Sequence, residues 1–150
     1  MKILLPVDGT ELSLHETRFA LQLLRQGLQA SFVLANVQEP ASFYEMVTAS
    51  SPELIEGAAM EAGEDLMEPS ARLLRDAGVP FETAVVQGDP AQAMLELIEQ
   101  FGCDMVVMGS RALGPVRRWL EGGSTSQRLV QSSPVPVLLV TPPEPVAEGA

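Results

Sequence analysis

The sequence predicts a Rossmann-like α/β fold: one domain whose five-stranded parallel sheet has the order 3-2-1-4-5 and carries helices on both faces. Short apolar runs alternate five times along the chain with segments of helical periodicity, which is typical of parallel strands joined by helices. The strand-like runs are almost continuously apolar, as expected for strands buried on both faces. The chain has 150 residues, of which 46% are hydrophobic, enough for one full core.

The first half of the chain predicts two strands and two helices. They are strand Lys2–Val7, helix 10–27, strand Ser31–Val37 and helix 51–78. Pro6 is expected near the end of its strand, because proline donates no ladder hydrogen bond. Thr10 or Ser13 can cap the first helix, whose apolar face is Leu12, Phe19, Ala20, Leu23 and Leu24. Pro69 predicts a kink or a restart in the second helix.

The second half predicts three strands and two helices. They are strand Pro80–Val86, helix 90–102, strand Asp104–Met108, helix Gln127–Gln131 and strand Val135–Val140. Asp89 is expected to cap the helix that Pro90 begins. Pro136 marks the last strand as a sheet edge, and an exposed apolar edge favours pairing with a second copy. We therefore expect a homodimer through Val135–Val140, a domain over residues 1–141 and a disordered tail over 142–150.

The segment after the fourth expected strand is a candidate anion site. It runs from Met108–Gly109 to the glycines and hydroxyls of Gly122–Ser126. Glycine lets the main chain approach an oxyanion, and the first N–H groups of a helix point towards it. Three of the nine basic residues, Arg111, Arg117 and Arg118, lie here in an otherwise acidic chain. The alternative is a glycine-rich surface loop with solvated arginines.

Two loops are expected to meet where the strand order reverses. Ligands of open parallel sheets bind beyond the carboxyl ends of the strands at this position. The loop Asp8-Gly9-Thr10 follows the first expected strand, and the loop beginning at Gly109 follows the fourth. A carboxylate beside a phosphate-binding loop suits a nucleotide better than a lone anion.

Composition excludes several classes of function. The net charge of -11 and the pI of about 4.4 argue against binding nucleic acid or an anionic membrane surface. No segment has the apolar length of a membrane span, and no signal peptide is recognisable at the N-terminus. A single cysteine cannot form an intramolecular disulfide or a cysteine-based metal cluster. We expect a cytoplasmic protein.

Four segments carry a resemblance to a known family. They are Ile3–Glu11, Gln87–Ala91, Val106–Arg111 and Ser133–Leu138. On these segments the chain resembles the universal stress protein family, through Val140. The resemblance implies an adenine nucleotide alpha hydrolase-like fold and a stress-response regulator that binds ATP, ADP or AMP as a homodimer, with an unknown protein partner.

The resemblance also implies a set of nucleotide-binding residues. They are Pro6, Val7, Asp8, Val37, Met108, Gly109, Ala112, Gly122, Gly123, Ser124, Thr125 and Ser126. Asp8 would hold the ribose or adenine, the main chain of Val37 would bind the adenine edge, and the glycine loop would bind the phosphates, which hold any Mg²⁺. Arg111 is added for its charge.

Two departures from the family's glycine motif leave an alternative open. Ala112 stands where the second glycine is expected, and Gly122 is followed by Gly123 rather than by a hydroxyl. One inserted residue restores the ending at Gly123-Ser124. A methyl group at a close phosphate contact forces a different approach. The alternative is therefore a regulatory dimer of the same fold that binds no nucleotide.

Catalytic groups do not assemble in the sequence. His15 shares a helix face with Leu12 and Phe19, as expected of a histidine at the edge of the core. Cys103 is expected to be buried and inert. We predict a protein that is not an enzyme, with at most slow incidental ATP hydrolysis. A flavodoxin-like FMN carrier is disfavoured, because the loop after the first strand is short and acidic.

Overall fold

One parallel sheet forms the centre of the molecule. The computed structural model describes residues 1–38, 52–110 and 125–142. The strands are β1 (Lys2–Pro6), β2 (Ser31–Gln38), β3 (Phe81–Gln87), β4 (Met105–Gly109) and β5 (Val137–Val140). The helices of the described residues are α1 (Glu11–Arg25), α3 (Pro52–Asp76), α4 (Pro90–Phe101) and α6 (Thr125–Ser132). The sheet order β3-β2-β1-β4-β5, with every pair parallel, confirms the predicted fold.

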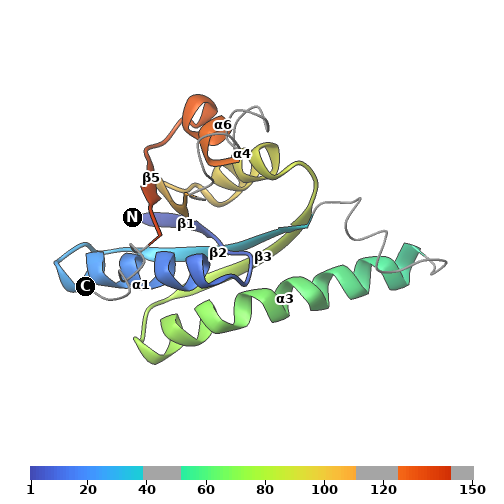
Figure 1. The fold of residues 1–150 in the computed structure, drawn as a ribbon, viewed down its shortest axis with the longest axis horizontal. Helices are drawn as coiled ribbons and strands as arrows, with labels where there is room; N and C mark the ends of the chain where they lie inside the picture. The colour runs from blue at the N-terminus through green and yellow to red at the C-terminus, as the bar shows by residue number, and fades with distance from the viewer. Residues whose placement is uncertain (39–51, 111–124, 143–150) are drawn as a thin grey trace, which may run out of the picture.

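The helices cover the sheet in two layers. Figure 1 shows α1 and α3 on one side of the sheet and α4 and α6 on the other. Each layer encloses its own apolar core: Leu5 and Val107 pack with α1 and α3, whereas Leu4 and Val106 pack with α4 and α6. Neighbouring residues of β1 and β4 thus enter opposite cores, which explains why the central strands are apolar without interruption.

Local capping explains where the helices begin and end. The Thr10 hydroxyl accepts the Ser13 N–H at 3.3 Å and begins α1, so Thr10 is the cap. The Asp89 carboxylate accepts the Gln92 N–H at 3.1 Å and begins α4, as predicted. Gly102 ends α4 with a φ of 65°, a left-handed conformation that glycine adopts without strain.

Two sequence expectations need correction, and a third is narrowed. Helix α3 runs through Pro69 without a restart, so of the predicted kink or restart only the kink remains as a prediction. The most buried stripe of α1 is Ser13, Glu16, Thr17 and Ala20, and the larger apolar residues flank it. The last strand begins at Val137 rather than Val135, because Pro136 has no N–H to donate to the ladder, although its carbonyl accepts the Val106 N–H at 2.9 Å.

Two further expectations concern the edge position of the last strand and the absence of a membrane span. Strand β5 is an edge of the sheet, as predicted, and its Leu139 side chain is 39% exposed. Dimerisation through this strand stays a prediction. Among residues 1–38, 52–110 and 125–142, no helix is both long and apolar enough to cross a membrane.

Candidate functional site

The ends of β1 and β4 separate at the point where the strand order reverses. We call this place the switch point and define it by Pro6, Val7, Asp8, Glu16 and Gly109. The β1–β4 ladder pairs Ile3 with Met105 and Leu4 with Val106, and the pairing stops there. Along a strand, the N–H groups of successive residues point alternately to the neighbouring strand on one side and to the one on the other.

Proline explains why this ladder stops. Val7 donates its N–H to the Ala35 carbonyl of β2 at 2.8 Å, so Pro6 faces β4 with no N–H to donate. Ser110 donates to Val140 of β5 at 2.8 Å, so Gly109 faces β1. The Gly109 N–H is therefore available to a side chain at the switch point.

The Asp8 carboxylate is held by the first turn of α1. Its Oδ1 accepts the Thr10 N–H at 3.1 Å, the Thr10 hydroxyl at 2.6 Å and the Ser13 hydroxyl at 2.7 Å. The Ser13 Oγ in turn accepts the Asp8 N–H at 2.9 Å. Gly9 allows this tight turn with a φ of 81°. The geometry fixes one carboxylate at the end of β1.

Asn36 connects the ends of β1 and β2. Its side chain is buried, and its Nδ2 donates to the Val7 carbonyl at 2.9 Å. Its Oδ1 accepts from Gln38 Nε2 at 2.8 Å. Sequence analysis did not find this role. The signal was a lone amide within an apolar strand, since a buried amide needs partners.

The main chain of Val37 faces the side of β2 where β1 has ended. The Ala35 carbonyl points to β1 and the Gln38 carbonyl points to Gly88 beyond β3, at 3.0 Å. Val37 therefore directs its main chain to the β1 side, and the β1–β2 pairing ends at Pro6 and Ala35. This arrangement is what the predicted adenine contact requires.

Glycine is needed at the end of β4. A Cβ atom on Gly109 would lie 2.7 Å from Leu12 Cγ, so no larger residue fits without movement. Its N–H donates to Glu16 Oε1 at 2.6 Å. The side chain of neighbouring Met108 is buried on the α4 and α6 face. Gly109 thus lets α1 pack closely against β4.

Glu16 is a buried acid that sequence analysis missed. Its side chain is 2% exposed, and its Oε2 has no hydrogen-bond partner among the described residues. Burial raises the pKa of Glu16 well above its usual range, and the nearby Asp8 charge raises it further, against the opposing effect of the Gly109 N–H. The available signal was its spacing from Ser13, Thr17 and Ala20 on one helix face.

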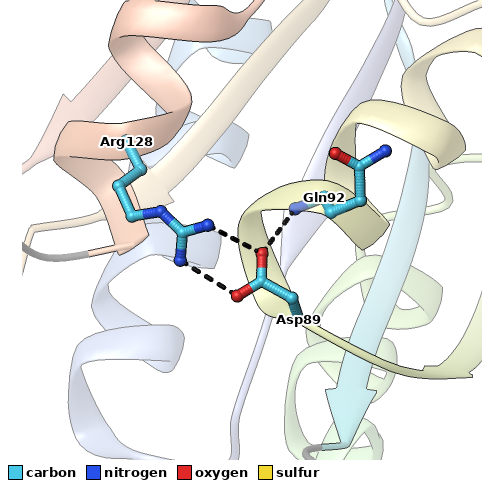
Figure 2. Close-up of polar contacts among 3 residues, drawn as sticks. All are labelled: Asp89, Gln92 and Arg128. Carbon is cyan, nitrogen blue, oxygen red and sulfur yellow. Dashed lines mark hydrogen bonds and ion pairs between the residues drawn. The ribbon is translucent and has the colours of Figure 1, made fainter.

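Helix α6 begins with two of the predicted phosphate-binding residues, Thr125 and Ser126. Ser126 is buried. Figure 2 shows how α6 is tied to α4: Arg128 Nη1 and Nη2 donate to Asp89 Oδ1 and Oδ2 at 2.9 and 3.0 Å. The Arg128 guanidinium, followed by the Gln92 N–H, lowers the pKa of Asp89. This surface pair joins the beginning of α6 to the beginning of α4.

The remaining candidates lie outside the described residues. They are Arg111, Ala112, Gly122, Gly123 and Ser124.

Within the described part of the chain, no group of three or more His, Cys, Asp or Glu side chains could hold a metal ion. Cys103 is buried, and burial raises the pKa of its thiol. The structure therefore brings together the ends of β1, β2 and β4, which carry Pro6–Asp8, Val37 and Met108–Gly109.

Residues 1–141 match the Universal stress protein family. The chain belongs to this family. A universal stress protein of Methanocaldococcus jannaschii is 27% identical over 143 residues, which cover 95% of this chain and 83% of the relative. The resemblance read from the four sequence segments is confirmed.

Solved structures of this family share the fold. A universal stress protein in complex with cAMP has a TM-score of 0.68 and 22% identity, covering 94% of this chain and 96% of its own. A universal stress protein family member from Arabidopsis thaliana with AMP bound has a TM-score of 0.69 and 20% identity, and the match covers 96% of this chain and 93% of that one. At this level of identity the likeness shows the fold alone.

Proposed function

We propose that this universal stress protein is a regulatory module that binds an adenine nucleotide at the switch point. The observation that carries the proposal is the convergence of three elements. The Asp8 carboxylate, the main chain of Val37 and the end of β4 lie at the carboxyl ends of three adjacent strands. Ligands of open α/β sheets bind at this place.

The polar groups of Asp8 and Val37 suit different parts of a nucleotide. A carboxylate held by α1, such as Asp8, suits a ribose hydroxyl, because it accepts hydrogen bonds in a fixed position. The main chain of Val37 lies beyond the last β1–β2 pair of the described residues, Pro6 with Ala35, and suits the hydrogen-bonding edge of adenine. Family members with cAMP and with AMP bound support the same ligand class.

The phosphate contacts of the proposal lie after β4. The loop residues Arg111, Ala112, Gly122, Gly123 and Ser124 would meet the phosphates, together with Thr125 and Ser126 at the start of α6. Helix N-termini favour anions through their free N–H groups. We propose ATP as the nucleotide, with Mg²⁺ held through its phosphates, and a cytoplasmic homodimer through β5 as the acting form.

The proposed action is binding rather than catalysis. A nucleotide-dependent change in affinity for a protein partner would serve a stress-response regulator without chemistry on the ligand. One observation favours the alternative, a regulatory dimer that binds no nucleotide. Asp8 already accepts three internal donors on Oδ1, which is a sufficient structural reason for a carboxylate in the turn before α1.

Titration calorimetry with ATP and Mg²⁺ separates the two functions. We expect saturable binding to the parent protein and weaker binding to Ser124→Ala, which removes a phosphate donor from the proposed loop. The control is Ser133→Ala, because the Ser133 hydroxyl bonds to Val135 at the opposite end of α6. The absence of heat from the parent at millimolar nucleotide would contradict nucleotide binding and leave the regulatory dimer.

A further inference from the structure

Glu16 occupies the place that the β1–β4 ladder leaves open. Pro6 has no N–H to offer β4, and the next main-chain donor facing β1 is the Gly109 N–H, which bonds to Glu16 Oε1 at 2.6 Å. The side chain reaches this place from the second turn of α1. The carboxyl group of Glu16 therefore contacts the last residue of β4, directly before the loop that the proposed function assigns to phosphate binding.

The surroundings of Glu16 favour its uncharged form. Helix α1 packs against α3, β4 and β5. Over residues 57–76 of α3, the buried side chains are Ala59, Met67, Ser70, Ala71 and Leu74, none of them charged, and β4 and β5 contain no titratable residue. Among the described residues, Asp8 is the charged group that acts on Glu16, and it is also an acid. An ionised Glu16 would therefore be a buried negative charge close to the half-buried carboxylate of Asp8.

We propose that Glu16 is a proton-linked positioning residue: a nucleotide bound at the switch point and a proton on Glu16 favour each other. The inference rests on the proposed function. Phosphates bound near Gly109 bring negative charge close to the carboxyl group of Glu16, which accepts the Gly109 N–H. Ionised Glu16 repels that charge, whereas protonated Glu16 keeps its bond to the Gly109 N–H and adds no charge.

The linkage has a measurable size. Over the pH range between the pKa of Glu16 in the free protein and its higher pKa in the complex, each bound nucleotide takes up as much as one proton. Affinity then falls by up to about tenfold for each pH unit, since one proton enters the binding equilibrium. Outside this range affinity is independent of Glu16.

Calorimetry in two buffers of different ionisation enthalpy counts this proton directly. ATP with excess Mg²⁺ is titrated at each pH unit from 5 to 9 into the parent and into Glu16→Gln, whose amide oxygen still accepts the Gly109 N–H but binds no proton. The nucleotide's own proton change is common to both proteins and cancels in the difference. We expect the parent to take up more protons, by as much as one, and to lose affinity more steeply as pH rises.

A second variant controls for charge alone. Glu11→Gln removes one carboxylate from the same helix at an exposed position and should behave as the parent. Equal proton uptake by the parent and Glu16→Gln across this pH range, with both binding ATP, would overturn the linkage and leave nucleotide binding intact. Absence of binding by both proteins would overturn the proposed function and the linkage with it.

Discussion

Glu16 makes the stability of the unliganded protein depend on pH. In the unfolded chain its carboxyl titrates near the ordinary value of 4.5, whereas burial raises its pKa in the folded state. Below pH 4.5 both states hold the proton. As pH rises further, the unfolded state releases the proton while the folded state keeps it, so the free energy of unfolding falls by up to about 1.4 kcal/mol per pH unit. The loss ends above the folded-state pKa.

Glu16→Gln should remove this dependence. Other carboxylates also titrate, so the informative quantity is the difference in unfolding free energy between the variant and the parent. Urea denaturation followed by circular dichroism at pH 4.5, 6, 7 and 8 measures that difference. We expect Glu16→Gln to gain stability over the parent steadily from pH 4.5 upward. A difference that stays constant with pH would refute the assignment of Glu16 as a protonated buried acid.

Three further predictions concern packing and charge. Gly63→Ala should destabilise the protein in urea, because the new Cβ would lie 2.5 Å from Val85 Cγ1, and overpacking of about 1–3 kcal/mol exceeds the gain in helix propensity. Gly57→Ala on the same helix meets nothing within 4 Å and should stabilise by up to about 1 kcal/mol. Arg128→Ala should destabilise the protein at neutral pH and flatten its acid denaturation, because the low pKa of Asp89 gives stability that is lost as pH falls. Thermal melts from pH 3 to 7 test this; unchanged melting, or an effect that 1 M salt leaves untouched, would contradict it.

The order of the sheet was predictable because the sequence signals were local and agreed with one another. Apolar runs, the Asp89-Pro90 helix start and the Gly102 stop each specify one element, and right-handed crossovers between parallel strands restrict the topology to a few forms. The restart that Pro69 allowed did not occur, because the cost of the proline is local, whereas packing along the 25 residues of α3 maintains the helix.

The switch point was predictable only in outline. Asp8 and Gly109 followed from strand ends and glycine, which sequence displays directly. Glu16 could not be predicted, because a glutamate on a helix is usually solvated. Its burial depends on the open end of the β1–β4 ladder, where Pro6 makes no pair with β4. Asn36 was missed for a similar reason: its partner, the Val7 carbonyl, is remote in sequence.

The amide resonances of the protein during a titration with ATP and Mg²⁺ test the central claim most directly. The account predicts saturable shifts centred on Asp8, Val37 and Gly109, at the ends of three adjacent strands. The amide resonances of residues at the amino ends of the strands, such as Lys2 in β1 and Ser31 in β2, should not shift. Absence of shifts, or shifts confined to residues away from the switch point, would contradict the placement of a nucleotide site there.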